Sequence, residues 1–517
     1  MKYALSASQM KSLDQMTIQE IGIESLVLME RAALGVVEEI KKHVTLKDRI
    51  LVVCGSGNNG GDGFAVARIL LAQGHSVDAM FVGSMAKMTL ECKKQMQIAV
   101  KMGLSMRTEL LFSEYNIIVD GIFGIGLDRP VHGEFANVIE RINEQKESAF
   151  VIAIDIPSGI SADTGQKLDY AVKADVTVTF QEMKRGLLLY PGAEYAGNII
   201  VKDVGIMPYQ FNDQEVVYRY YEPEDIHRLL PKRMDYSNKG SYGKVLIVAG
   251  SDTITGAAYL SAMSAYRMGT GLVKILTAAS IIPILRTQLP EALFVCYDGK
   301  NASQEIENAV KWASAIVIGP GLSMSEQAKL VFTKVCDLVK KTMTPMVMDA
   351  DALNILSEQI DQESKCKEKR LCLIKERVPA NTILTPHLLE FSRLTLETVH
   401  KIPSILIDIT EECTYNSELT YVLKDTRTIV ASKNLRYINR SGNNGMATGG
   451  SGDVLTGIIA ALLAEGLNRE EAATLGVYLH GLAGDYARKK LGAYSMLARD
   501  IIEALSEVLM NYERRKL

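Results

Sequence analysis

The sequence lacks the features that mark secreted, membrane-spanning and nucleic-acid-binding proteins. Its 517 residues include only seven cysteines, an odd number with no CxxC or CxxH spacing, which argues against a disulfide framework and a structural zinc site. The formal net charge of −4 gives no indication of a basic surface for nucleic acid. The longest apolar run, near residues 458–463, is far shorter than the roughly 20 residues that cross a membrane, and residues 1–6 lack the apolar stretch of a signal peptide. We therefore expect a cytoplasmic protein that binds neither nucleic acid nor a membrane.

The composition is that of an ordinary globular protein, with 47% hydrophobic and 23% charged residues. A chain of 517 residues is too long for one hydrophobic core, so two or three domains are expected. Residues 209–224 mix aromatic and acidic side chains without any period, and we place the domain boundary there, between residues 1–212 and 213–517. The charged stretch 363–377 is expected to be a solvated insertion without function.

The first domain shows alternating strands and helices. An apolar strand at 49–54 leads straight into the glycine-rich loop 55–63 and a helix at 64–71, which is the arrangement that binds phosphate in doubly wound α/β proteins. Further strands are expected at 77–82, 117–120, 150–154, 176–180 and 199–204. We therefore predict a Rossmann-like domain, in which helices cover both faces of a parallel sheet.

Polar side chains stand where the strands of this domain end. They are Asn58, Asn59, Asp120, Asp155 and Ser158. Because ligands of open α/β sheets lie outside the carboxyl ends of the strands, these side chains could converge on one ligand. Their amide, carboxylate and hydroxyl oxygens suit a hard cation. A single Asp at a strand end is as often a helix cap, but two of them beside an Asn-Asn-Gly-Gly loop favour a site.

A second set of alternating elements fills the rest of the chain. Strands are expected at 245–249, 270–275, 315–318, 346–348, 382–384, 428–431 and 437–439. The stretch 441–457 is rich in glycine, carries Asp453 and runs into an apolar helix, so its backbone N–H groups are predicted to bind an anion. A carboxylate repels a bound phosphate, so Asp453 is predicted to deprotonate an acceptor hydroxyl beside a nucleotide. A helix-capping Asp is the alternative.

Motifs in both halves resemble those of known families. Gly-Asn-Asn-Gly-Gly-Asp-Gly at 57–63, with the motifs at 120–126 and 155–159, resembles the YjeF N-terminal family, the epimerases of hydrated NADH and NADPH. The second half carries motifs at 256–258, 319–321, 349–351, 385–387 and 443–457. These resemble the ribokinase-like, nucleotide-dependent NAD(P)H-hydrate dehydratases. The two halves in this order are similar to the fused, bifunctional NAD(P)H-hydrate repair enzymes.

The resemblance implies an α/β fold of two doubly wound domains, Rossmann-like and then ribokinase-like, with two activities. The first domain would interconvert the R and S forms of hydrated NADH and NADPH. The second would dehydrate the S form, using ADP or ATP to phosphorylate the hydroxyl at C6, so that AMP or ADP and phosphate are released. Magnesium would accompany the nucleotide, potassium would bind in the first domain, and the chain would form a homo-oligomer.

The resemblance also implies site residues. Contacts to the hydrate in the first domain would come from Asn58, Asn59, Gly60, Gly61, Asp62, Gly124, Ile125, Gly126, Leu127, Asp128, Arg129, Pro130 and Asp155. Potassium would be held by Asn59, Asp120 and Ser158. In the second domain the hydrate would contact Ala258, Gly321, His387 and Asp453, and the nucleotide would contact Lys424, Asp425, Thr426, Arg427, Thr428 and Gly452. Asp453 is the implied base. Either Asp120 or Asp155 could move the proton of the epimerisation, and a metal ligand is not free to act as that base.

The sequence departs from the dehydratase pattern at two places. Leu388 and Leu389 follow His387 where the family has Pro-Gly, and Asp425 follows Lys424 where the family has glycine. These changes leave open whether the second domain keeps full activity and the usual nucleotide preference. Two other functions also stay open: a kinase of a small hydroxylated molecule, which would release a stable phosphate ester, and a binding protein that has lost turnover.

Overall fold

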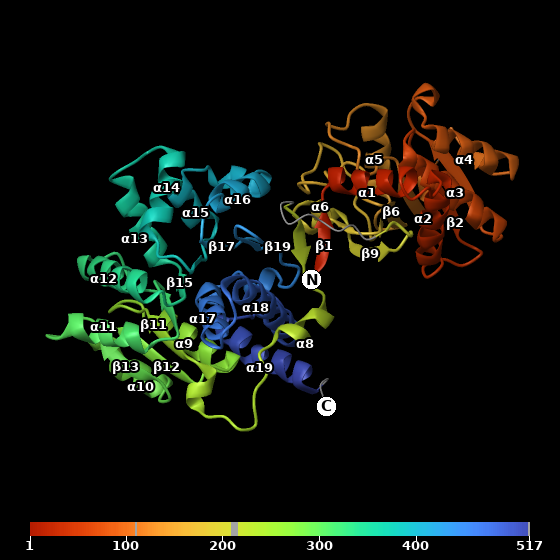
Figure 1. Cartoon of the computed structure of the whole chain (residues 1–517). Coiled ribbons are helices and arrows are strands. Elements are labelled where there is room, and N and C mark those ends of the chain that lie inside the picture. The colour runs from red at the N-terminus through yellow and green to blue at the C-terminus, as the bar shows by residue number, and fades with distance from the viewer. Residues whose placement is uncertain (109–110, 208–215, 515–517) are drawn as a thin grey trace. The chain divides into compact units, whose positions relative to one another are not determined.

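The computed structural model describes residues 1–108, 111–207 and 216–514. The chain divides into two compact units (Figure 1). The first unit comprises residues 3–218, and the second comprises residues 1–2 and 219–517. The domain boundary predicted between residues 212 and 213 lies outside the described residues. Within the described ranges, no helix is both long enough and apolar enough to cross a membrane.

The first unit is built on a parallel sheet. Its strands are β2 (Arg49–Cys54), β3 (Ser76–Phe81), β4 (Ser105–Met106), β5 (Ile117–Gly121), β6 (Phe150–Ile154), β7 (Val176–Phe180) and β9 (Asn198–Lys202). They lie in the order β4-β3-β2-β5-β6-β7-β9, and each neighbouring pair is parallel. This order confirms the Rossmann-like prediction. Because the chain changes direction along the sheet between β2 and β5, a ligand crevice is expected outside the carboxyl ends of these two strands.

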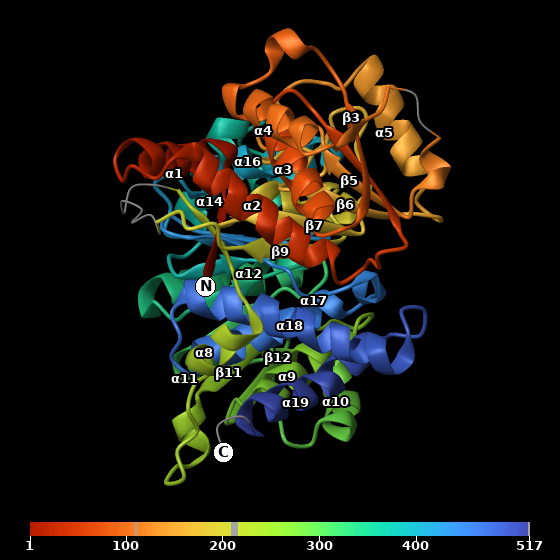
Figure 2. The ribbon, with the colours of Figure 1, turned by 90° about the vertical axis from the view of Figure 1, so that its right-hand side faces the viewer.

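Helices cover both faces of this sheet (Figure 2). They are α1 (Ala7–Gln19), α2 (Ser25–Ile40), α3 (Asn58–Ala72), α4 (Leu90–Lys101) and α5 (Glu134–Glu144). Alternate residues of β2 belong to two different cores. Ile50, Val52 and Cys54 pack with α2 and α3, whereas Leu51 and Val53 pack with α5. All five are fully buried, which is why the strand is a continuous apolar run rather than an alternating one.

The second unit has a mixed sheet. Its strands are β11 (Lys244–Val248), β12 (Leu272–Thr277), β13 (Leu293–Cys296), β14 (Ala315–Ile318), β15 (Met346–Met348), β16 (Thr382–Leu384), β17 (Thr420–Leu423), β18 (Ile429–Ala431) and β19 (Arg436–Ile438). The order runs β13-β12-β11-β14-β15-β16-β17-β18-β19. Pairs from β13 to β17 are parallel, and β18 is antiparallel to both of its neighbours.

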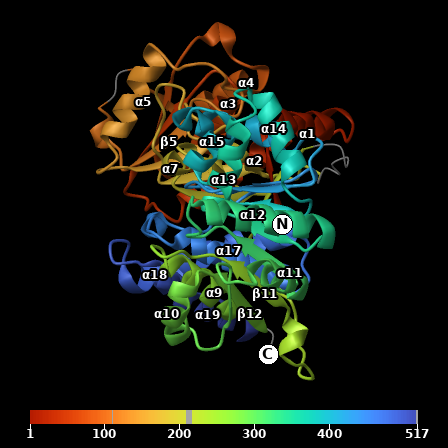
Figure 3. The same ribbon diagram turned by 90° about the vertical axis from the view of Figure 1, so that its left-hand side faces the viewer.

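Two helix layers enclose this second sheet (Figures 1 and 3). On one face, α9 (Gly256–Met268), α17 (Ser451–Ala464), α18 (Arg469–Leu491) and α19 (Ala498–Arg514) share a core with Val245 and Ile247 of β11. The other layer contains α11 (Ala302–Trp312), α12 (Glu326–Thr342) and α13 (Asp351–Asp361), which pack on one another in chain order. The second α/β domain predicted from the sequence is thereby confirmed.

Two details of the second unit were not predicted. The strands β13 and β17 were not predicted, although each has four residues and the predicted strand β15 has only three. The charged stretch 363–377 is not simply a solvated insertion, because most of it forms α14 (Lys367–Arg377). The Arg370 side chain on this helix is fully buried, and its guanidinium donates to Leu394 O at 2.8 Å and pairs with Asp361.

Candidate functional site

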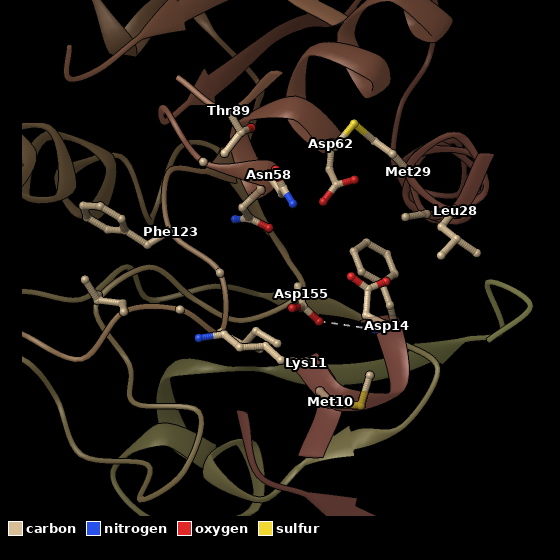
Figure 4. A pocket seen from close by; sticks show the side chains of 18 of the residues that line it. Met10, Lys11, Asp14, Leu28, Met29, Asn58, Asp62, Thr89, Phe123 and Asp155 are labelled. Atoms are coloured by element: carbon tan, nitrogen blue, oxygen red, sulfur yellow. Dashed lines mark hydrogen bonds between the residues drawn. The ribbon is translucent and has the colours of Figure 1, made fainter. Parts of the chain in front are cut away.

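A cavity of about 590 Å³ lies in the first unit at the carboxyl ends of β2, β5 and β6 (Figure 4). Helices α1 and α2, the start of α3 and the loop 122–129 form its walls. The expected residues that line it are Asn58, Asn59, Asp62, Gly124, Ile125, Gly126, Leu127, Asp128, Arg129 and Asp155. Gly60, Gly61, Asp120, Pro130 and Ser158 are not part of the lining. The structure thus brings together most of the residues predicted to contact the ligand.

The loop after β2 requires glycine where two stretches of backbone touch. A Cβ atom on Gly55 would lie 2.0 Å from Ile122 O, and one on Gly60 would lie 1.9 Å from Gly55 O. A Cβ atom on Gly57 would meet nothing within 4 Å. Gly55 N also donates to Gly121 O at 3.0 Å. The loop after β2 therefore lies directly against the loop after β5, which places the first turn of α3 beside the cavity.

Asp120 is buried outside the cavity lining and is held by a hydroxyl and a backbone N–H group. Ser158 Oγ donates to Asp120 Oδ1 at 2.6 Å, and Ser158 N donates to Oδ2 at 2.8 Å. Burial raises the pKa of Asp120 to about 6, although the hydrogen bonds from Ser158 lower it. Asn59 lies nearby against Gly124, and its buried Nδ2 has no hydrogen-bond partner. Asn59, Asp120 and Ser158, the three residues expected to hold a cation, are therefore all buried where β2, β5 and β6 end.

Three carboxyl groups, those of Asp14, Asp62 and Asp155, line the same cavity (Figure 4). Asp155 Oδ1 lies 2.6 Å from Nζ of Lys184 and accepts a hydrogen bond from Thr179 Oγ1 at 3.1 Å. Burial raises the pKa of Asp62 well above its usual range and also raises that of Asp14, and the charge of Asp155 adds to both shifts. The cluster is therefore suited to hold and transfer protons inside the cavity.

Lys184 and Asp14 were missed from the sequence. Lys184 lies on β8 (Met183–Lys184), shortly after β7, and is only 1% exposed. A lysine just beyond a strand end was the signal that could have revealed it. Asp14 lies in an amphipathic helix distant in sequence from every strand end that forms the cavity, so no local pattern marks it.

In the second unit, the stretch 441–457 leads into a helix as predicted. Helix α17 begins at Ser451, the preceding Gly450 has φ of 90°, and Asp453 lies in the first turn. Burial raises the pKa of Asp453 to about 7, and the charge of Asp349 adds to this shift while Lys424 opposes it. A carboxyl group with this pKa can exchange a proton near neutral pH.

An ion pair lies beside the start of α17. Lys424 Nζ is 2.7 Å from Asp349 Oδ1. A Cβ atom on Gly452 would lie 3.3 Å from Lys424 Nζ and 3.5 Å from Asp349 Oδ2, so glycine leaves room between the loop and the pair. The structure thus groups Lys424, Gly452 and Asp453, and it adds Asp349, for which the sequence suggested no role.

His387 is held by the helix that follows it, α15 (Leu388–Thr395). His387 Nδ1 accepts from Leu389 N at 3.1 Å and Glu390 N at 3.3 Å, while His387 N donates to Glu390 Oε2 at 2.8 Å. Lys424 N donates to Pro386 O at 2.9 Å, which keeps His387 next to Lys424. The two leucines that stand where the family has Pro-Gly are therefore the first residues of α15, and His387 caps this helix.

The remaining predicted residues lie around α9 and beyond β17. Ala258 is fully buried on α9, which adjoins the glycine loop because Ser261 Oγ donates to Asp453 O at 3.0 Å. Gly321 has φ of 61°, and a Cβ atom there would lie 2.7 Å from Ile254 Cγ2. Residues 425–428 connect β17 to β18 directly after Lys424.

Comparisons with known proteins match both units. The family described as YjeF-related protein N-terminus matches residues 25–186, and the family described as NAD(P)H-hydrate dehydratase matches residues 245–507. A relative from Thermofilum pendens, named a bifunctional NAD(P)H-hydrate repair enzyme, is 36% identical over 97% of this chain and 95% of its own. A relative of the same name from Escherichia coli is 31% identical over 95% of this chain and 90% of its own. Among solved structures, a ribokinase-like superfamily protein from Enterococcus faecalis is 27% identical with a TM-score of 0.50, and the match covers 59% of this chain and 99% of that chain.

Substituting alanine at two glycines of the first loop should have opposite outcomes. Gly60→Ala is expected to lower the free energy of unfolding by about 1–3 kcal/mol or more, because the new methyl group overlaps Gly55 O. Gly57→Ala is the matched control and should change it by less than about 0.5 kcal/mol. Urea unfolding followed by circular dichroism measures both. Equal effects would show that the loop does not pack as described.

Removing the ammonium group of Lys184 should destabilise the protein. Lys184→Met leaves the carboxylate of Asp155 without its ion-pair partner, so the free energy of unfolding is expected to fall by about 3 kcal/mol. Lys11→Met, which removes an exposed ammonium group at the mouth of the same cavity, is the control and should cost less than about 0.5 kcal/mol. If Lys184→Met lowered the free energy of unfolding no more than Lys11→Met does, the ion pair between Lys184 and Asp155 would not stabilise the protein as expected.

Proposed function

The chain belongs to the family of bifunctional NAD(P)H-hydrate repair enzymes, and on this premise we propose how its residues divide the repair. The protein is an NAD(P)H-hydrate epimerase and an ADP/ATP-dependent NAD(P)H-hydrate dehydratase. The matched ranges assign the epimerase to the first unit and the dehydratase to the second. This membership decides against the small-molecule kinase and the binding protein that the sequence left open.

The dehydration is proposed to depend on Asp453. The carboxylate takes the proton of the C6 hydroxyl of the S hydrate as the nucleotide's terminal phosphoryl group is transferred to that oxygen. The backbone N–H groups at the start of α17 stabilise the charge that develops on the phosphoryl group. Phosphate then leaves C6 with the electrons of the C6–O bond, C5 loses a proton to the departing phosphate or to water, and the C5=C6 double bond of the dihydronicotinamide ring is restored. The observation that supports this role is the position of Asp453 in the first turn of α17 with its pKa raised to about 7.

Lys424 and Asp349 are proposed to serve the nucleotide. The ammonium group of Lys424 lies against Gly452, where it can approach a phosphate bound by the loop. Magnesium is usually bound by one or two carboxylates together with substrate phosphates, and Asp349 Oδ2 also faces Gly452. Asp349 is therefore the residue we assign to the ion, which would neutralise charge on the phosphates. Residues 425–428 would contact the rest of the nucleotide.

In the first unit, Asp155 rather than Asp120 is proposed to transfer the proton of epimerisation. Asp155 lines the cavity, whereas Asp120 is fully buried and does not. The cavity also presents the N-terminus of α3 and the loop 124–129 to the phosphates of the hydrated nucleotide. Asp155 has φ of 64°, a conformation that residues other than glycine adopt mainly where the surrounding structure requires it.

Asp120, Ser158 and Asn59 are proposed to hold potassium. In the described ranges no group of three or more His, Cys, Asp or Glu side chains is arranged as a metal site, so a cation here would depend on amide, hydroxyl and carbonyl oxygens around one carboxylate. Such oxygen donors suit a hard, weakly charged cation. The buried carboxyl of Asp120 is consistent with this role, and Asn59 would contribute its amide oxygen. The homo-oligomer and the cytoplasmic location stay predictions from the sequence.

The dehydratase should lose activity as the pH falls through the pKa of its base. Because Asp453 must be ionised to accept a proton and its pKa is about 7, kcat/KM is expected to drop about tenfold for each pH unit below that value. Asp453→Asn should cost about 10²–10⁴-fold above pH 7 and should lack the inflection, so that the difference from the wild type shrinks as the pH falls. The near-ultraviolet absorbance of the restored dihydronicotinamide ring measures the rate on the S hydrate with ADP and magnesium.

Glu465 provides a matched control for this pH profile. It follows the last residue of the same helix, and burial raises its pKa to about 7 as well. Glu465→Gln should keep both the rate and the inflection of the wild type. An inflection that disappears in Glu465→Gln, or that persists in Asp453→Asn, would assign the titration to another group.

A mixture of R and S hydrates separates the two activities within one chain. With ADP and magnesium, the wild type should restore the whole mixture to NADH. Asp155→Asn should stop after the S fraction and then continue only at the rate of spontaneous epimerisation, because its second unit is unchanged. Asp453→Asn should restore almost nothing. Recovery of the whole mixture by Asp155→Asn at the wild-type rate would exclude Asp155 from the epimerisation.

A further inference from the structure

Helix α1 supplies one wall of the epimerase cavity. Its lining residues are Met10, Lys11, Asp14 and Ile18, whose spacing places them on one side of the helix. Figure 4 shows Lys11 and Asp14 near Asp155, with Asp62 and Asn58 across the hollow. The carboxyl group of Asp14 thus borders the same space as the proposed proton carrier Asp155.

The position of α1 is fixed by the strand that carries Lys184. Strand β1 (Lys2–Leu5) pairs in parallel with β8, with Leu5 opposite Lys184. The helix begins directly after β1, where Ser6 and Gln9 form a capping box, and Ala7 N donates to Asp163 Oδ1 at 2.8 Å. One strand pair therefore places both the partner of Asp155 and the helix that presents Asp14.

The two carboxyl groups differ in their partners. Asp155 is paired with the ammonium group of Lys184 at 2.6 Å. Asp14 has no such cation among its described contacts, and burial together with the charge of Asp155 raises its pKa. Neighbouring carboxyl groups whose environments differ in this way commonly divide into an acid and a base. Asp62 lines the same cavity, and burial raises its pKa as well, so Asp62 is the competing candidate for the donor.

We propose that Asp14 is the proton donor of the epimerisation and that Asp155, which lies near it in the same cavity, is the base. This proposal rests on the assignment of the epimerase to the first unit. The hydroxyl to be removed is bonded to C6, which is also bonded to N1 of the ring, so the departing oxygen needs a proton and the nitrogen lone pair can replace the lost bond.

The step balances without any co-reactant. The Asp14 carboxyl transfers its proton to the C6 hydroxyl, the C6–O bond breaks, and water departs as N1 and C6 form a double bond. Water then adds to the opposite face of C6, and the proton that this water loses passes through other water in the cavity to Asp155. The proton returns from Asp155 to Asp14 through water in the cavity, which regenerates both groups. The reverse reaction exchanges the two roles, as microscopic reversibility requires.

The test measures epimerisation alone, with purified full-length protein, R hydrate and no adenine nucleotide. Separated epimers are quantified by chromatography for the wild type, Asp14→Ala and Glu20→Ala. Glu20 is the matched control because it is an exposed carboxylate that follows the last residue of the same helix. Each protein is also assayed for dehydration of the S hydrate, which reports on the second unit, and for its urea midpoint, which reports on folding.

Asp14→Ala is expected to lower kcat about 100-fold or more, in the range that general acid catalysis contributes, while KM changes less than about threefold. Added formate should restore part of the lost kcat, because a small carboxylic acid can occupy the vacated space and donate the proton. Glu20→Ala should keep the wild-type kcat with and without formate. A purely structural role of Asp14 would not produce rescue by formate.

Several outcomes would overturn the proposal. The first is a kcat of Asp14→Ala that stays within about threefold of the wild-type value. The second is a lower kcat that formate does not restore in a variant whose urea midpoint equals that of the wild type. A loss of kcat in Asp62→Ala that formate rescues, with Asp14→Ala unaffected, would transfer the role to Asp62. If the wild type itself does not interconvert the epimers, the epimerase assignment fails instead, independently of Asp14.

Discussion

Both sites depend on one constraint, namely that the strands of a parallel sheet end at the same edge. The loops that leave this edge crowd against one another, and glycine is required where their backbones touch. Gly55 and Gly60 meet this requirement in the first unit, and in the second unit a Cβ atom on Gly319 would lie 1.9 Å from Asp349 O. The helix that follows each glycine loop directs its positive N-terminal end toward this edge, where it can bind an anion. The binding of phosphate is thus a consequence of how the sheet ends.

The two units combine a buried ion pair with a second carboxyl group in the same way. Lys184 pairs with Asp155 in the first unit, and Lys424 pairs with Asp349 in the second. The additional carboxyl group, Asp14 or Asp453, is partly buried near the paired carboxylate, and its pKa is raised by burial and by that charge. A paired carboxylate close to one with a raised pKa gives a site two groups of different proton affinity, which acid–base chemistry needs.

The sequence predicted the features that arise from local patterns. The strand, glycine loop and helix around Asn58 and Asp453 are contiguous in the chain, so their geometry follows from spacing alone. Lys184 and Asp14 could not be found in this way, because they enter the site through the pairing of β1 with β8, two short strands far apart in the sequence. Arg370 was misjudged for a related reason. Its burial depends on the backbone of residues in another helix, which a charged composition does not reveal.

The helix that follows His387 determines which ring nitrogen of this residue can donate a hydrogen bond. The backbone N–H groups of Leu389 and Glu390 both point to Nδ1, so this nitrogen is an acceptor and cannot carry a proton. Burial and the nearby Lys424 lower the pKa of His387, which favours the neutral ring. The proton of a neutral imidazole must then lie on Nε2. His387 would therefore meet the hydrate as a hydrogen-bond donor, which suits a contact to a carbonyl or phosphate oxygen and excludes a second base beside Asp453.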